Sequence, residues 1–420
     1  MNIKIKLMIV ALMVPLFLYA QQSLIISKPE DAGFSGERLA RIDQTITEHL
    51  NAGHIPGAVA MIVRNGKIVY HKSFGYSNVE SKTPLRKDDI FRMASQSKAI
   101  TSLAVMMLWE ENKFQLDDPI SKYIPEFKNP RVMVRFNMAD SSYTTEPARS
   151  EVTIRQLLTH SSGIDYAGIG SQEFKAIYAK AGITSGIGGF TGRTIGEAMR
   201  KLGTMPLKHH PGERYTYGLN SDVLGYLVEV VSGKSFDEFL RTRIFQPLGM
   251  KDTYFYLPKE KHNRLVNLSE HRGDGMASIS HEIYDRFNPE YPKFEGTYYS
   301  GGAGLSGTIE DYAKFLQLFI NQGTFNGVRL ISRKTVELML TNQIPELSAD
   351  PFGLGFGLET VKNDYLQPSS IGTFSWGGAF NTNYWGDPKE KIVALIYTNI
   401  YGARYGNMGF KTLVYQAIND

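Results

Sequence analysis

Three short segments of this 420-residue chain carry side chains whose types and spacing could do chemistry. The first is Ser95-Gln-Ser-Lys98, at the start of residues 99–111, where apolar positions recur at helical spacing. Residues at i and i+3 share one helix face, so the Ser95 hydroxyl and the Lys98 amine can touch. A helix N-terminus also offers free N–H groups and positive potential at the serine. The pair could form an activated nucleophile, although a capping serine beside a solvated lysine gives the same pattern.

The second and third segments offer a proton carrier and an anion site. Tyr217 lies in Pro211-Gly-Glu-Arg-Tyr-Thr-Tyr217, just ahead of a predicted helix over residues 221–231. It could carry a proton in a cleft, but a core aromatic is the simpler interpretation. The third segment is Phe374-Ser-Trp376-Gly377-Gly378-Ala379, in a predicted strand. Strand glycines let a ligand approach backbone N–H groups that can bind an oxyanion, and a β-bulge is the alternative.

Together the three segments resemble, in order and spacing, the serine β-lactamase-like family. That family includes class C β-lactamases, D,D-peptidases and related carboxylesterases and transesterases. The resemblance covers nearly the whole chain after residue 20. It extends to further segments, namely Leu157-Leu-Thr-His-Ser-Ser-Gly163, Asp222-Val-Leu-Gly225, Pro247-Leu-Gly-Met-Lys-Asp-Thr253, Gly301-Gly-Ala-Gly-Leu305 and Phe352-Gly-Leu-Gly-Phe-Gly357.

The resemblance implies a role for each residue of the candidate site. Ser95 would be the nucleophile, Lys98 its partner and Tyr217 the general base. The N–H groups of Ser95 and Ala379 would form the oxyanion hole. The other substrate-binding residues would come from the same strand, namely Trp376, Gly377 and Gly378.

Two departures from the family pattern bear on the substrate. Leu219 stands where β-lactamases and D,D-peptidases carry an asparagine that binds the substrate amide, and the neighbouring Asn220 could point elsewhere. Trp376-Gly-Gly replaces Lys-Thr-Gly, whose lysine attracts a substrate carboxylate. A tryptophan offers an apolar face and a single N–H donor instead. Both changes resemble the esterase branch. Both weaken recognition of a carboxylate-bearing amide, unless Arg193, Lys208 or Arg214 supplies the missing charge from a loop.

These residues predict a secreted serine hydrolase that cleaves ester or amide bonds through an acyl-serine intermediate, with carboxylesterase activity preferred. One alternative is a β-lactamase or a D-Ala-directed peptidase. A second is a penicillin-binding protein that acylates without turnover, or a transesterase. The expected partner is a small-molecule ester or amide, and no cofactor is required by this chemistry.

The fold class expected from the pattern is α/β (α+β), with the β-lactamase-like arrangement. Two apolar runs at residues 58–63 and 67–71 flank Asn65-Gly66, a strong hairpin signal. Later runs at 373–376, 382–385 and 392–398 also predict strands, with helices over 308–319, capped by Thr308, and 407–418. Strand signals at both ends predict one antiparallel sheet flanked by helices. We expect a sheet part over about 21–93 and 300–420, a mostly helical part over about 94–299, including a mobile glycine-rich loop at 182–192, and an active site in the cleft between them.

The N-terminus is typical of an export signal. Lys4 and Lys6 precede an uncharged stretch over residues 7–20 that ends in Leu-Tyr-Ala. We expect residues 1–20 to be a signal peptide, cleaved near Ala20, and the remaining chain, 21–420, to be periplasmic or secreted. An uncleaved anchor is the alternative, but fourteen residues are fewer than the about 20 that a membrane span needs.

Composition excludes several classes of protein. The absence of cysteine rules out disulfides, thiolate metal sites and a cysteine nucleophile. A net charge of +4 without a basic run does not suggest nucleic-acid binding. His209-His210 has no third ligand at a recognisable spacing, so no metal site is expected. The G-x-G-x-x-G of Gly302–Gly307 lacks the surrounding βαβ unit, and we interpret it as a tight loop at the floor of the cleft.

Overall fold

The computed structural model describes residues 24–183, 185–188, 190, 192–273, 275–281, 283, 287–402 and 408–420. The predicted signal peptide, residues 1–20, lies outside the described residues, as do parts of the glycine-rich loop at 182–192. Within the described ranges no helix combines the length and the apolar character needed to cross a membrane.

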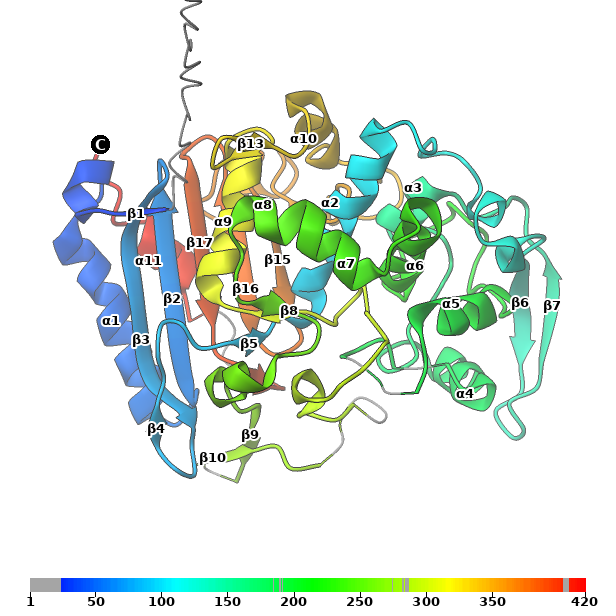
Figure 1. Cartoon of the computed structure of the whole chain (residues 1–420), viewed down its shortest axis with the longest axis horizontal. Coiled ribbons are helices and arrows are strands. Elements are labelled where there is room, and N and C mark those ends of the chain that lie inside the picture. The colour runs from blue at the N-terminus through cyan, green and yellow to red at the C-terminus, as the bar shows by residue number, and fades with distance from the viewer. Residues whose placement is uncertain are drawn as a thin grey trace, which may run out of the picture.

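Both ends of the chain contribute to one eight-stranded sheet (Figure 1). The strand order is β1-β3-β2-β17-β16-β15-β14, and β4 pairs with β3. Their bounds are β1 (Ile25–Ile26), β2 (Gly57–Arg64), β3 (Lys67–Asn78), β4 (Thr83–Pro84), β14 (Gly357–Leu358), β15 (Phe374–Gly378), β16 (Thr382–Asp387) and β17 (Ile392–Tyr397). Every neighbouring pair is antiparallel except the short β1 on β3. The predicted antiparallel sheet built from both ends is confirmed.

The hairpin between β2 and β3 forms as its sequence predicts. Asn65 and Gly66 both have positive φ angles, 52° and 75°. A two-residue turn of this kind matches the twist of the strands and favours asparagine followed by glycine. This turn sets the register in which Arg64 faces Lys67.

Side chains of β2 alternate between two cores, because helices cover both faces of the sheet. Ala58, Ala60 and Ile62 pack in a core with residues of α1 (Gly36–Asn51) and α11 (Phe410–Tyr415). Val59 and Met61 point the other way, into the main core. There α9 (Ile309–Ile320) packs on β2, β16 and β17. All of β2 is therefore buried, as expected for a strand covered on both faces.

Two helices show where the sequence predicted a helix end correctly and where it did not. Thr308 caps α9 by accepting a hydrogen bond from the backbone N–H of Asp311 at 3.2 Å. Asp311, which replaces the usual glutamate of a capping box, instead accepts from the N–H of Asp252 at 2.6 Å. The closing helix α11 is shorter than the predicted 407–418. It begins after Gly409, whose left-handed φ of 67° ends the preceding turn.

A mostly helical region lies beside the sheet (Figure 1). Its helices are α3 (Ile154–Leu158), α4 (Gln172–Ala181), α5 (Ile195–Gly203), α6 (Asn220–Ser232), α7 (Phe236–Leu240) and α8 (Gln246–Leu248). A π-helical turn, Arg241–Phe245, separates α7 from α8. A hairpin of β6 (Arg131–Phe136) and β7 (Tyr143–Pro147) was not predicted. The division of the chain into two parts at the predicted boundaries stays a prediction.

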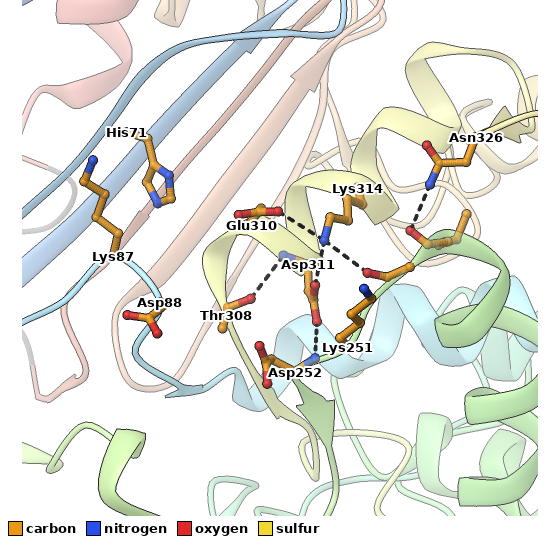
Figure 2. A pocket seen from close by; sticks show the side chains of 12 residues that line it. His71, Lys87, Asp88, Lys251, Asp252, Thr308, Glu310, Asp311, Lys314 and Asn326 are labelled. Carbon is orange, nitrogen blue, oxygen red and sulfur yellow. Dashed lines mark hydrogen bonds and ion pairs between the residues drawn. The ribbon is translucent and has the colours of Figure 1, made fainter. Parts of the chain in front are cut away.

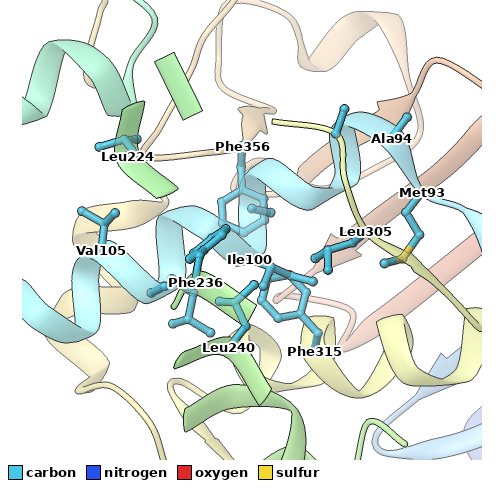
Figure 3. Packing of buried hydrophobic residues seen from close by; sticks show 14 of the residues in the cluster. Met93, Ala94, Ile100, Val105, Leu224, Phe236, Leu240, Leu305, Phe315 and Phe356 are labelled. Carbon is cyan, nitrogen blue, oxygen red and sulfur yellow. The ribbon is translucent and has the colours of Figure 1, made fainter. Parts of the chain in front are cut away.

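Helix α2 (Ser97–Glu110) passes through the main core. Figure 3 shows Ile100 and Val105 of this helix among side chains from α6, α7 and α9, including Leu224, Phe236 and Phe315. Its residues Ser97–Leu108 are all buried. Such a helix makes a rigid platform, and a group at its N-terminus is held firmly in place.

Candidate active site

Ser95 is the point at which the buried core opens. From Asp89 to Leu108 it is the one residue that is not buried. It lies in a short 3-10 turn, Ala94–Gln96, that leads into α2. The preceding Ala94 has a φ of 45°, a left-handed conformation that non-glycine residues adopt rarely. Backbone strain of this kind gathers at functional sites, where the surrounding packing maintains it.

The Lys98 amine lies beside the Ser95 hydroxyl, as the i and i+3 spacing predicts. Its Nζ donates to Oγ of Ser95 at 3.2 Å, to the hydroxyl of Tyr166 at 3.1 Å and to the carbonyl of Gly302 at 2.7 Å. Lys98 is only 3% exposed. These contacts use all three N–H groups of a lysine ammonium. The side chain is therefore fixed, and it is not a solvated surface lysine.

The loop over residues 301–305 lies against α2 and forms the floor of the site. Thr101 donates to the carbonyl of Gly301 at 2.7 Å, and the hydroxyl of Ser97 accepts from the N–H of Leu305 at 3.0 Å. A Cβ atom at Gly301 would overlap the carbonyl oxygen of Ser221 on α6. The glycines of this segment thus allow close approach of the backbone, and the loop is structural in the way expected.

Tyr217 lies directly ahead of α6, with its ring at the active-site lysine. The Lys98 Nζ is 4.6 Å from the centre of the Tyr217 ring, and the Trp376 ring is 5.8 Å away from the same centre. A cation over an aromatic face is attracted by the ring electrons. The structure therefore brings the Ser95–Lys98 segment, Tyr217 and Trp376 together from three parts of the chain.

Tyr166 is a site residue that sequence reasoning missed. Its hydroxyl accepts a hydrogen bond from Lys98, and its ring lies 5.5 Å from that of Tyr217. Burial raises the pKa of the Tyr166 phenol well above its ordinary value, so the group stays protonated. Its position three residues after Gly163, at the end of a segment singled out by resemblance, was the available signal.

The third segment approaches the nucleophile closely. Strand β15 packs against the turn that carries Ser95. A Cβ atom at Gly378 would overlap the carbonyl oxygen of Met93 and the hydroxyl of Thr382. Only glycine permits this approach. It places the end of β15, which Ala379 directly follows, against the turn that carries Ser95, and the oxyanion hole formed by these two N–H groups stays a prediction.

Asn220 and His160 form a buried structural pair. The Asn220 Nδ2 lies 2.9 Å from Nδ1 of His160, and Ser162 donates to the Asn220 side-chain oxygen. Burial, with the Lys98 charge nearby, holds the pKa of His160 well below its ordinary value, so the ring is neutral. Asn220 is thus engaged inside the protein and does not replace the family asparagine.

Aromatic rings line the site around Trp376. The ring centre of Phe352 lies 5.2 Å from that of Trp376. It lies 5.8 Å from the ring centres of Tyr215 and His160. Two of the three cations considered from sequence have other partners. Lys208 forms an ion pair with Asp165 at 2.7 Å, and Arg193 donates to the carbonyl of Gly182. The third, Arg214, is exposed.

Other candidate sites show no comparable arrangement. His209 makes hydrogen bonds to the carbonyl of His210 and the hydroxyl of Thr216, both at 2.8 Å. No cluster of three metal-ligating side chains occurs in the described part of the chain. A cavity of about 410 Å³ beside the start of α9 is lined by charged groups (Figure 2). Its central Lys314 is already bonded to Glu310, Asp311 and the Gly249 carbonyl.

Known proteins are similar to this chain over most of its length. A family model described as Beta-lactamase matches residues 42–411. Esterase EstB of Burkholderia gladioli is 31% identical over 381 residues, which cover 86% of this chain and 90% of that protein. A relative in Escherichia coli (strain K12), whose name proposes a D-alanyl-D-alanine carboxypeptidase, is 26% identical over 396 residues, 89% of this chain and 85% of its own.

Solved structures show the same architecture. EstCE1, described as a hydrolase with promiscuous acyltransferase activity, superimposes with a TM-score of 0.77 at 25% identity. The match covers 91% of this chain and 99% of that one. The expected fold, a central sheet flanked by helices with a helical region beside it, is confirmed by this likeness and by the strands and helices themselves.

Proposed function

Because the chain belongs to the Beta-lactamase family of serine hydrolases, we propose that it is a carboxylesterase that acts on neutral esters through an acyl-serine intermediate. One observation carries this proposal. The Tyr217 ring lies 4.6 Å from the amine of the Ser95–Lys98 pair and 5.8 Å from the ring of Trp376, which stands where the resemblance places a carboxylate-binding lysine.

In the proposed reaction, Oγ of Ser95 attacks the ester carbonyl carbon, and its proton passes to the oxygen of Tyr217, a step that requires Tyr217 to act as the phenolate. The Lys98 ammonium stabilises the negative charge that develops, and the N–H groups of Ser95 and Ala379 bind the oxyanion. The C–O bond then breaks, and the leaving alcohol takes the proton. Water attacks the acyl-serine in the second half of the cycle, which releases the carboxylic acid and restores Ser95.

The aromatic lining supports a neutral acyl group. Stripping water from a substrate carboxylate is costly unless a partner replaces that water. Trp376 and Phe352 offer no charged partner, but they can bury acyl methylenes, each worth about 0.8 kcal/mol. We therefore expect short to medium neutral acyl esters to be preferred over penicillins and carboxylate-ended peptides.

The experiment is a steady-state comparison of p-nitrophenyl butyrate, a chromogenic cephalosporin and a D-Ala-D-Ala peptide on the purified protein. We expect the highest kcat/KM for the butyrate, with activity and phosphonate labelling abolished in Ser95→Ala. A clear preference for the cephalosporin or the peptide would favour a β-lactamase or peptidase. A burst of one product equivalent without turnover would indicate a penicillin-binding protein that only acylates.

An alcohol, in place of water, is a second possible acceptor of the acyl group. EstCE1, which matches almost over its full length, is described as having acyltransferase activity. An alcohol could attack the acyl-serine in place of water, and the ester product would identify a transesterase. Adding a short alcohol to the butyrate assay and quantifying the new ester by chromatography decides between the two.

We also propose that residues 1–20 direct export and are removed, so that the protein acts in the periplasm or outside the cell. The support is the order of the sequence: Lys4 and Lys6, then an uncharged apolar stretch, then Ala20. N-terminal sequencing of the exported protein should begin near Gln21. A protein that retains Met1 in the cytosol would contradict the proposal.

A further inference from the structure

Asp222 is a buried carboxylate with no ion-pair partner among the residues that the structure describes. It lies in the first turn of α6 and is 0% exposed. Its carboxylate oxygens make no hydrogen bond of ordinary geometry within the described ranges, and the nearby Ser300 hydroxyl and Gly302 N–H offset only part of the cost of burying its charge. Burying an ionisable group without compensation costs free energy, so such a residue in a native protein requires an explanation.

The Asp222 side chain lies directly behind the floor of the active site. A Cβ atom added to Gly302 would lie 2.7 Å from Oδ2 of Asp222 and 3.4 Å from the hydroxyl oxygen of Tyr166. Gly302 and Tyr166 are the two groups, besides Ser95, that accept hydrogen bonds from Lys98. The carboxylate therefore backs both acceptors that fix the lysine amine.

The groups that face Asp222 come from three other segments. They are the Lys98 amine of α2, the Tyr166 ring, and the Ser300 hydroxyl and Gly302 N–H of the floor loop. Lys98 is the cation in this set. The other titratable groups at Lys98 are Tyr217 and His160. Because burial keeps His160 neutral, it adds no second positive charge.

We propose that Asp222 is a positioning residue for acylation: its buried carboxylate faces the Lys98 amine across the Tyr166–Gly302 floor and holds the lysine in place beside Ser95. The inference rests on the proposed serine-hydrolase function. Opposite charges attract strongly inside a protein, where the effective dielectric constant is low. The charge behind the floor thus favours one place for the lysine amine, while Asp222 itself does not touch the substrate.

This arrangement predicts an acid limb in the pH profile. Burial raises the pKa of Asp222 to about 6, although Ser300, Lys98 and Gly302 oppose the rise. Protonation below that pH removes the negative charge behind Lys98. The rate of ester hydrolysis should therefore fall as the pH decreases, with an apparent pKa near 6.

The experiment compares the wild-type protein with Asp222→Asn and Ser300→Ala in p-nitrophenyl butyrate hydrolysis, from about pH 4.5 to 8.5. Asp222→Asn should lower kcat by about 10-fold or more, with KM changed less than about twofold, and should remove the acid limb. Ser300→Ala takes away a hydroxyl that favours the ionised carboxylate. It should move the acid limb to higher pH, and the position of the limb is read relative to the plateau rate of the variant itself.

An Asp222→Asn protein that keeps both the plateau rate and the acid limb would overturn the proposal. If that variant fails to fold, Ser300→Ala decides: an upward shift of the limb supports the proposal, and an unmoved limb refutes it. A wild-type protein that shows no Ser95-dependent hydrolysis of any ester contradicts the proposed function itself, which separates the two kinds of failure.

Discussion

Gly378 and Met93 approach each other so closely that a Cβ atom on the glycine would overlap the carbonyl oxygen of Met93. This contact joins strand β15 to the segment that leads into Ser95. It fixes the position of Ala379, one residue further along, relative to the nucleophile. The second glycine of Trp-Gly-Gly is therefore a packing requirement of the site, and its effect on chemistry is indirect.

Gly378→Ala should reduce activity strongly, because the new methyl group must push β15 away from Met93. Loss of one oxyanion donor costs about 10²–10³ in kcat in enzymes of this type of chemistry, and we expect a loss of that order. Gly275→Ala is the matched control, since no atom of the described residues lies within 4 Å of a Cβ there. Steady-state kinetics and thermal melting of both variants check this. Full activity in Gly378→Ala would show that the spacing of the two segments does not matter.

The two tyrosines near Lys98 should differ in importance. Tyr217→Phe keeps the ring beside the lysine but removes the proposed general base, a role worth about 10²–10⁴ in rate. Tyr166→Phe removes one of three hydrogen bonds to Lys98, worth about 1.5–3 kcal/mol for a charged donor. We expect both variants to fold and the Tyr217 variant to lose more kcat. A larger loss in Tyr166→Phe would show that the proton transfer had been assigned to the wrong tyrosine.

The sequence predicted the elements better than it predicted the contacts. The hairpin at Asn65-Gly66 and the i and i+3 pair at Ser95 and Lys98 depend on local geometry, and both occur as expected. Tyr166 and Asp222 reach Lys98 from other segments, so their part in the site depends on how distant loops and helices pack. Local periodicity carries no information on that packing.

Leu219 illustrates the same limit. It stands in the position of the family asparagine, which suggests a cleft residue, yet the structure buries it completely. A Cβ atom at Gly186 would overlap its Cδ2. Leu219→Asn should therefore not restore recognition of a substrate amide. It should destabilise the protein by about 1–3 kcal/mol, because the amide would be buried without partners.

Chemical unfolding of Leu219→Asn, with Leu219→Met as the volume-conserving control, measures this cost, and the control should lose less than about 1.5 kcal/mol. The same proteins can be assayed with a chromogenic cephalosporin. A stable Leu219→Asn protein that gains cephalosporin hydrolysis would show that the side chain can reach the substrate.

The free energy of unfolding should also record the buried Asp222 charge. Its pKa is raised from 3.8 to about 6 in the folded protein, so between about pH 4 and pH 6 the folded state binds more protons than the unfolded state. The stability that this group contributes is full below about pH 4 and is lost as pH rises through about 6. A shift of about two units corresponds to about 3 kcal/mol.

Asp222→Asn should therefore be more stable than the wild-type protein at about pH 7.5 and nearly equal to it at about pH 4, because an asparagine side chain resembles the protonated carboxyl at every pH. Urea unfolding of both proteins at the two pH values measures the difference, and the pH dependence of groups that do not interact with Asp222 cancels in the comparison. A carboxylate kept for packing alone predicts the opposite sign, a variant destabilised at neutral pH. Greater stability combined with lower kcat would mean that the protein retains an unfavourable buried charge because the Ser95–Lys98 pair requires it.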